Sequence, residues 1–219
     1  MLPNDRTMKE DVLFINKHHE STAQTIFEKV MEERTDKYII AVSGESESGK
    51  SEVSYVLGRM LRKKGIHTKI LNMDSFYKIP PLERRAWRQK HGVESIGYSE
   101  YDWKTIERVI KDFKAGNTSE MPYGDVISNQ IDRLITDFKD IELLIINGLY
   151  SIMVNKADLK IFIELSYKET TNKQLKKDIE EVDEWRMKEL EREHEVIESI
   201  RGEANYFVDL DTSMNMYHL

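Results

Sequence analysis

The chain has 219 residues, enough for one α/β domain with a well-buried core and short for two. Charged residues make up 33% and hydrophobic residues 39%, a composition that favours a soluble globular protein over a disordered one. The net charge of -7 argues against a broad basic surface for nucleic acid, and the lack of cysteine excludes disulfides and thiolate chemistry.

The hydrophobic runs of the chain are short. The longest, at 38–42 and 143–146, cannot span a bilayer, and the charged start MLPNDRTMKED lacks the apolar segment of a secretory signal. We therefore expect a cytoplasmic protein with no membrane and no nucleic-acid partner. A homo-oligomer stays open, because the composition does not determine an oligomeric state.

Residues 1–36 are predicted to form an N-terminal arm and helix. A short apolar run at 12–15 suits either a strand or a loose arm. From His18 to Arg34 apolar residues recur at steps of three and four, which is typical of an amphipathic helix packed on a sheet. Ser21 or Thr22 would cap this helix.

The stretch YIIAVSGESESGKS carries the strongest signal in the chain. An apolar, β-branched run ends at Gly44 and a helical pattern opens after Lys50, so the motif G-x-x-x-x-G-K-S lies between a strand and a helix. The backbone N–H groups of such a loop converge on an anion, and the next helix aims its positive end at the same place. We predict a P-loop for nucleoside triphosphate phosphates; an ordinary glycine-rich turn is the alternative.

Two residues of this loop have individual predicted roles. Lys50 would place a positive charge on the β- and γ-phosphates, and the Ser51 hydroxyl would ligate Mg²⁺. The predicted nucleotide-binding residues are Gly44, Glu45, Ser46, Glu47, Ser48, Gly49, Lys50, Ser51 and Glu52.

Residues 37–219 are predicted to form a single domain in which strands alternate with helices. Helices are expected over 50–64, 82–90 and 104–115, and strands over 68–74, 141–148, 159–165 and 205–210. The piece 121–125 is predicted to be turn-like and the segment up to Lys139 to be mixed. This order predicts an α/β fold with a doubly wound, mostly parallel sheet flanked by helices. Ligands sit outside the carboxyl ends of such strands, which places Asp74 beside the P-loop.

Two segments break the alternation. Residues 75–103 are loop-rich and aromatic, which suits a substrate-binding insertion; a surface excursion with its aromatic rings packed inward is the alternative. Residues 169–201 are strongly helical and acidic, and we expect their acidic side chains to form a solvated face. The apolar residues expected to pack are Ile179, Val182, Leu190, Ile197 and Ile200.

Three pieces, GESESGKS, LNMDSFYK and YDWKTIE, stand in one order and resemble the phosphoribulokinase/uridine kinase family of P-loop kinases over roughly 37–180. The resemblance implies a P-loop NTPase fold with a helical lid at 169–201. It also implies ATP and Mg²⁺ as cofactors, and transfer of the γ-phosphoryl group to a hydroxyl on a small-molecule substrate.

The resemblance also implies roles for single residues. Asp74 would act as the base toward the acceptor hydroxyl, assisted by Lys50, and Ser51 with Asp74 would hold the metal. The residues expected at the substrate are Tyr77, Asp102, Tyr123 and Lys177.

The sequence departs from the family pattern in three places. The pair Asn147-Gly148 stands where the family carries Glu-Gly, and no histidine lies between Tyr123 and Lys139, where nucleoside kinases read the pyrimidine. Lysines at 173–178 replace an arginine-rich lid run, although lysine lacks the bidentate fork of arginine. Two hypotheses stay open: a uridine kinase-like enzyme for a nucleoside or another sugar or alcohol, and a weakly active or non-catalytic nucleotide-binding sensor.

Overall fold

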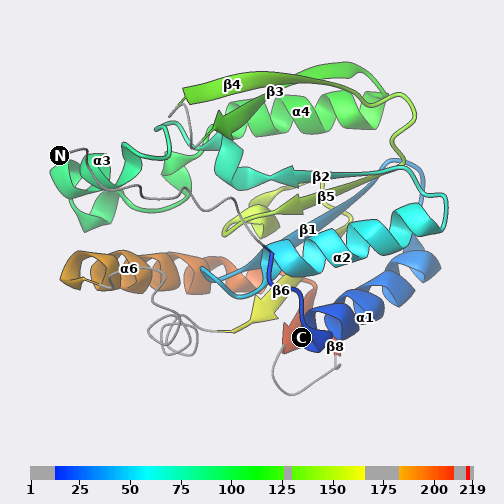
Figure 1. The fold of residues 1–219 in the computed structure, drawn as a ribbon, viewed down its shortest axis with the longest axis horizontal. Coiled ribbons are helices and arrows are strands. Elements are labelled where there is room, and N and C mark those ends of the chain that lie inside the picture. Colours follow the sequence, from blue (N-terminus) through cyan, green and yellow to red (C-terminus); the bar gives the residue numbers. More distant parts are fainter. Residues whose placement is uncertain (1–12, 126–129, 166–182, 210–215, 218–219) are drawn as a thin grey trace, which may run out of the picture.

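The computed structural model describes residues 13–125, 130–165, 183–209 and 216–217. Its main sheet has the strand order β2-β5-β1-β6-β7-β8, and only the last pair is antiparallel (Figure 1). The strands are β1 (Tyr38–Gly44), β2 (Thr68–Asn72), β5 (Leu143–Asn147), β6 (Leu159–Glu164), β7 (Tyr206–Asp209) and β8 (Met216–Tyr217). The predicted α/β fold with a mostly parallel sheet is confirmed.

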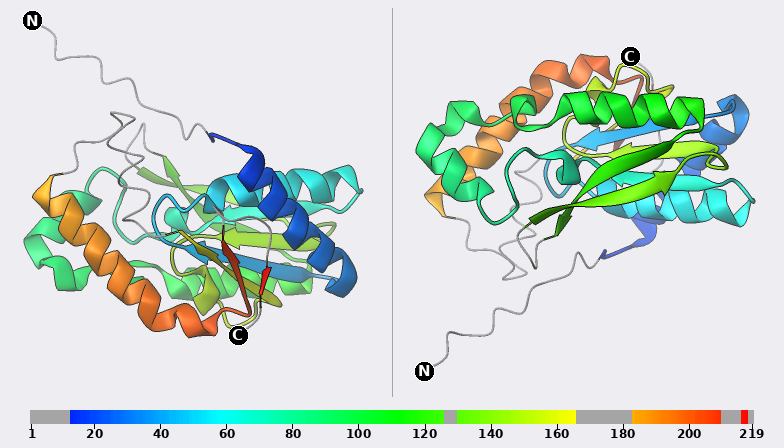
Figure 2. Two further views of the ribbon diagram at one scale, coloured as in Figure 1. Left: turned by 90° about the horizontal axis from the view of Figure 1, so that it is seen from below. Right: turned by 90° about the horizontal axis from the view of Figure 1, so that it is seen from above.

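Helices cover both faces of the sheet. One face is covered by α1 (Lys17–Glu33) and α2 (Lys50–Lys63), and the other by α4 (Trp103–Ala115) and α6 (Glu184–Ile200) (Figure 2). The alternation of side chains along each strand explains this arrangement, since Ile40 of β1 packs with α1 and α2 while its neighbour Ile39 packs with α4.

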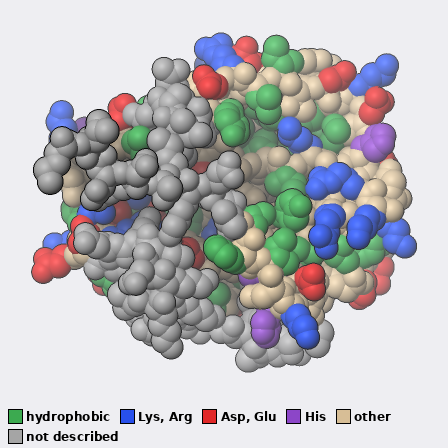
Figure 3. All heavy atoms as spheres, viewed as in Figure 1, with side chains coloured by type: hydrophobic (Ala, Val, Ile, Leu, Met, Phe, Trp, Pro, Cys, Tyr) green, Lys and Arg blue, Asp and Glu red, His purple; other side chains and the backbone are tan. Residues whose placement is uncertain are grey.

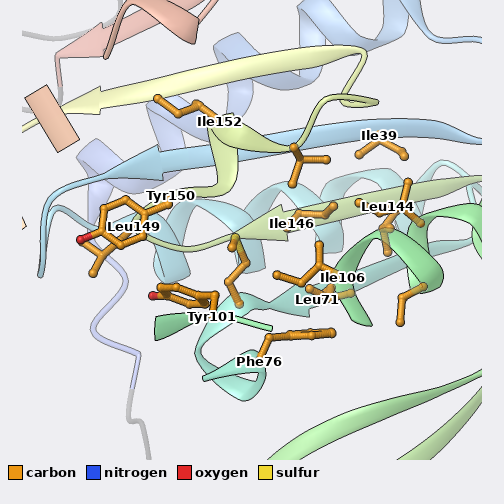
Figure 4. Close-up of a cluster of buried hydrophobic side chains, with 14 of the residues drawn as sticks. Ile39, Leu71, Phe76, Tyr101, Ile106, Leu144, Ile146, Leu149, Tyr150 and Ile152 are labelled. Carbon is orange, nitrogen blue, oxygen red and sulfur yellow. The ribbon is translucent and has the colours of Figure 1, made fainter. Parts of the chain in front are cut away.

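The core under α4 and α6 is rich in aromatic rings, several of them drawn in Figure 4. Tyr101 and Tyr150 are fully buried, and their rings meet edge to face with centroids 5.6 Å apart. Tyr77 is also buried. The inward-packed alternative for the aromatic residues of 75–103 therefore holds for Tyr77 and Tyr101.

Several predicted boundaries shift in the structure. The N-cap of α1 is Asn16, whose side chain accepts hydrogen bonds from two backbone N–H groups of the first turn, so the predicted caps Ser21 and Thr22 are wrong. The helix predicted at 82–90 is α3 (Arg84–His91). Strand β2 ends at Asn72, so Asp74 lies in the 3₁₀ turn η1 (Met73–Phe76) that follows the strand.

The prediction for 121–125 is wrong, because these residues belong to a β-hairpin. Strand β3 (Thr118–Asp125) pairs antiparallel with β4 (Gln130–Asp137) in a separate two-stranded sheet that lies along α4 (Figure 1). Pro122 and Gly124 weaken the strand pattern of the sequence, and Pro is tolerated here because the hairpin has edges on both sides. Leu134 and Ile135 of β4 are exposed, and Figure 3 shows hydrophobic side chains interspersed with charged ones over this part of the surface.

The acidic helix is confirmed only in part. Leu190, Ile197 and Ile200 of α6 are buried as expected, but Glu189 and Glu193 are also buried, at 3% and 5% exposed, so the acidic residues do not all form a solvated face. The predicted lid residues 169–182, with Ile179 and Val182, lie outside the described residues.

None of the helices in the described part of the chain has the length and apolar character that a membrane crossing requires.

Candidate active site

The P-loop motif lies where the sequence places it, between the end of β1 at Gly44 and the start of α2 at Lys50. A Cβ on Gly44 would come within 2.8 Å of the Ile163 carbonyl oxygen, so the close approach of β6 requires glycine there. Gly49 caps α2 in the left-handed conformation, at φ 86°. Glu47 also has a positive φ, 61°, and such strained backbone is frequent at ligand-binding loops.

Lys50 curls back over its own loop. Its Nζ donates hydrogen bonds to the Glu45 carbonyl at 2.5 Å and to Ser48 Oγ at 3.5 Å. Burial lowers the pKa of Lys50, while the negative charges of Asp74 and Glu193 act in the opposite direction. A phosphate oxygen in place of the carbonyl would satisfy the buried ammonium group more fully, since it carries charge.

Asp74 lies at the carboxyl end of the sheet, one turn beyond β2. It is exposed, and its backbone N–H donates to Asn72 Oδ1 at 3.0 Å. In the register of the sheet Asn72 stands beside Asn147, the last residue of β5. The negative charge of Asp74 acts to raise the pKa of Lys50 in the P-loop. The fold therefore brings the strand-end carboxylate and the phosphate loop to one edge of the sheet.

A cavity of about 420 Å³ opens next to this edge, between η1, the start of α4 and the hairpin. Tyr77 and Asp102, two of the predicted substrate residues, both line it, together with charged side chains of both signs. The charged lining residues are Lys78, Asp102, Arg108, Glu120, Asp132 and Arg133. The cavity therefore suits a polar, hydroxyl-rich molecule rather than a single strong anion or an apolar one.

The remaining predicted substrate residues are not brought to this cavity. Tyr123 is 55% exposed on β3 and is not among the described residues that line the cavity, although its neighbours Met121 and Pro122 are. Lys177 lies outside the described residues. Ser51 and Glu52 occupy the first turn of α2, next to Lys50.

Two residues of the cavity are held firmly by their neighbours. The Tyr77 ring packs on the Tyr101 ring with centroids 4.1 Å apart and against the Arg84 guanidinium, and burial raises the pKa of Tyr77. Asp102 caps α4, accepting hydrogen bonds from the Thr105 backbone N–H at 3.1 Å and from its hydroxyl at 2.6 Å. The hydroxyl hydrogen bond lowers the pKa of Asp102, which keeps it a carboxylate.

Helix α6 contacts the P-loop, which the sequence reasoning missed. Ser46 donates to Glu193 at 2.8 Å, and His194 Nδ1 lies 2.7 Å from Glu45 Oε1. The signal was present, since Glu193 lies three residues after the buried Leu190 and therefore on the same helix face.

Glu193 also belongs to a buried ionic cluster around Arg88 of α3. Arg88 donates to both carboxylate oxygens of Glu100 at 2.8 and 2.9 Å and to Glu193 at 3.1 Å, and Glu189 lies 3.6 Å away. Burial disfavours the charge, but the hydrogen bonds to Glu100 outweigh it and raise the pKa of Arg88. This cluster joins the segment that flanks the cavity to α6 and the P-loop.

A P-loop motif at the end of β1, a carboxylate just beyond β2 and a polar cavity that begins at the next residue form the arrangement expected of a P-loop phosphotransferase. The chain belongs to the Phosphoribulokinase / Uridine kinase family, which it matches over residues 39–211. The predicted family is confirmed, and membership makes the chain a small-molecule kinase that transfers phosphate to a hydroxyl group and implies the use of ATP.

Individual relatives are distant. The chain is similar to the uridine kinases of Mycoplasma pneumoniae, 24% identical over 146 residues, and Mycoplasma genitalium, 28% identical over 148 residues. These matches cover 65% and 64% of this chain and 67% and 66% of the relatives. A structure of a possible uridine kinase from Bacillus stearothermophilus has a TM-score of 0.63 at 18% identity, covering 86% of this chain and 97% of that one; it supports the fold alone.

Proposed function

We propose that the chain transfers the γ-phosphoryl group of ATP to a hydroxyl of a nucleoside or another sugar or alcohol metabolite, in the manner of a uridine kinase. The observation that carries this proposal is the polar cavity lined by Tyr77 and Asp102, which begins at Ser75, the residue after Asp74. A nucleotide sensor would need the phosphate loop alone, whereas a kinase needs a second site for the acceptor.

The proposed division of labour follows from the positions of the side chains. The P-loop amides hold the triphosphate and Lys50 neutralises charge on its terminal groups. Ser51 and Asp74 supply the oxygen donors that suit Mg²⁺, which would screen the phosphate charge when bound. Tyr77 and Asp102, which line the cavity, hold the acceptor.

The reaction itself needs one proton acceptor. The acceptor hydroxyl forms a bond to the γ-phosphorus while the bond from that phosphorus to the bridging oxygen of ADP breaks. Asp74 takes the hydroxyl proton as this bond forms, because its carboxylate is exposed at the edge that faces Lys50.

Two observations favour the second candidate function, a weakly active or non-catalytic sensor. Asn147 replaces the carboxylate that the family carries after this strand, and Glu193 brings a negative charge into contact with Ser46 of the phosphate loop. Both features weaken the binding of a fully charged triphosphate with its metal.

A panel of acceptors distinguishes the two functions. ADP release is measured with nucleosides, pentoses, polyols and hydroxy acids in turn, while calorimetry measures ATP binding with Mg²⁺ on the same material. We expect ADP release to rise with one chemical class of acceptor and to be lost in Lys50→Met, but not in the matched Lys63→Met, whose side chain is exposed at the far end of α2. Binding without turnover on every acceptor favours the sensor, and absence of ATP binding contradicts both functions.

Two substitutions separate the capping role of Asp102 from its proposed role at the acceptor. Asp102→Ala removes the N-cap of α4 and is expected to lower the free energy of unfolding by about 1 kcal/mol, whereas Asp102→Asn keeps a good cap. Both variants are expected to raise the KM for the acceptor, with the KM for ATP unchanged. Denaturant unfolding and steady-state kinetics measure the two effects. A wild-type acceptor KM in Asp102→Asn would leave Asp102 as a cap only.

A further inference from the structure

Three side chains that commonly bind metals meet where α6 crosses the P-loop. They are Glu45 of the loop and His194 and Glu198 of α6, and their ligand atoms all lie within 4.8 Å of one another. We propose that Glu45, His194 and Glu198 form a binding site for a divalent transition ion of the zinc class, separate from the Mg²⁺ of the nucleotide.

The sequence spacing suits such a site. His194 and Glu198 are four residues apart on one helix, so their side chains share a face, and Glu45 comes from a second element. His194 Nδ1 already lies 2.7 Å from Glu45 Oε1. A bound ion would lie between these two atoms in place of the hydrogen bond that now joins them.

The ligands are held on fixed backbone. Glu45 is 6% exposed, directly after β1. The residue before His194 is Glu193, which is buried and bonded to both Ser46 and Arg88. The hydrogen bonds of Glu193, the neighbour of His194, therefore hold α6 in a fixed position against the P-loop, as a preformed site requires.

The geometry needs only a small adjustment. Bonds of about 2.0–2.2 Å to nitrogen and oxygen place the donors of one tetrahedral zinc about 3.4 Å apart. The present atoms all lie within 4.8 Å of one another, at most about 1.4 Å beyond this spacing. The Glu45 and His194 atoms, now 2.7 Å apart, would separate slightly, and the exposed Glu198 side chain can rotate toward them. Its exposure also leaves an entry path and room for a water ligand.

The donor set determines the class of ion. One imidazole with two carboxylates and a water is a zinc-type arrangement, whereas Mg²⁺ and Ca²⁺ prefer oxygen donors alone. The competing account is that Glu45 and His194 form a hydrogen-bonded pair and nothing more. The two accounts differ in what Glu198 does, because Glu198 contributes only when an ion is present.

Zinc binding is tested on the metal-free full chain, without nucleotide. ZnCl₂ is titrated against the protein in competition with a chromophoric chelator. We expect one zinc per chain, with an affinity that falls about 10- to 100-fold in His194→Ala and about 10-fold in Glu198→Gln. The matched controls Glu191→Gln on α6 and His91→Ala on α3, whose side chains are exposed and outside the cluster, are expected to leave the affinity unchanged.

Several outcomes would overturn the proposal. One is the absence of saturable zinc binding. Another is a zinc affinity that neither His194→Ala nor Glu198→Gln changes, since the zinc would then bind to other histidines. Loss of stability in His194→Ala without zinc binding to the wild type would leave only the hydrogen-bonded pair of Glu45 and His194. Because Glu198 is exposed, Glu198→Gln is expected to fold normally, and circular dichroism checks this.

The proposal also requires that zinc binding does not depend on the Mg²⁺ of the nucleotide. Millimolar Mg²⁺ is expected to leave the zinc affinity unchanged, because the proposed magnesium donors are Ser51 and Asp74. Zinc that is displaced by Mg²⁺ would instead occupy the nucleotide site and contradict the proposal. No step of this test uses phosphoryl transfer, so its failure and that of the proposed kinase activity are distinguishable.

Discussion

Asp74→Asn is expected to lower kcat for phosphoryl transfer by about 10²- to 10⁴-fold, the usual contribution of a positioned general base. The amide has nearly the shape of the carboxylate but cannot accept the proton of the acceptor hydroxyl. The side chain is exposed, so the fold is expected to keep its stability. Steady-state ADP release, with the acceptor that the panel identifies, measures the effect.

Binding measurements decide how Asp74 acts. ATP affinity without Mg²⁺ is expected to stay within about threefold of wild type, because the P-loop amides and Lys50 are intact. A fall in affinity that occurs only with Mg²⁺ would show that Asp74 holds the metal as well. The matched control Asp140→Asn changes an exposed aspartate far from the cavity lining and is expected to keep full turnover. Full turnover in Asp74→Asn would exclude Asp74 as the base.

The position of the P-loop motif between β1 and α2 could be predicted from the sequence because its determinants are local. Backbone geometry requires glycine at Gly44 and Gly49, and Lys50 follows them at a fixed spacing. The conformation of the loop therefore depends almost entirely on residues within the motif itself. The parallel order of the sheet could be predicted for a similar reason, since short apolar runs alternate with amphipathic helices.

The acceptor side could be predicted less completely, because it depends on contacts between distant segments. The hairpin that walls the cavity contains Pro122 and Gly124, which hide the strand pattern. Asp102 was expected only at the acceptor, and its use as the cap of α4 becomes visible only once the helix start at Trp103 is known. Side-chain chemistry alone does not distinguish these two uses.

The acidic helix shows a third limit on sequence reasoning. A glutamate in the sequence is expected to lie at the surface, because burying an unpaired carboxylate costs free energy. Glu189 and Glu193 are buried all the same, since Arg88 reaches them from a segment about one hundred residues away in the chain. The pairing could be suspected from the helical spacing of Glu193 with Leu190, but its partner could not be identified.

Arg88→Met is expected to lower the free energy of unfolding by about 3–5 kcal/mol, because it leaves the carboxylates of Glu100 and Glu193 buried without their counter-charge. For a chain of this length the melting temperature is expected to fall by about 6–20 °C. The matched control is Arg85→Met on the same helix, whose partner Asp183 is half-exposed; such a pair contributes about 0–1 kcal/mol.

A triple variant distinguishes charge from packing at Arg88. If the loss comes from unpaired carboxylates, adding Glu100→Gln and Glu193→Gln to Arg88→Met removes those charges and restores a large part of the stability. If it comes from lost packing of the arginine side chain, the three substitutions add without recovery. Because Glu193 also accepts from Ser46, we expect recovery of stability in the triple variant without recovery of wild-type ATP affinity. Full recovery of both would show that the cluster has no part in holding α6 on the phosphate loop.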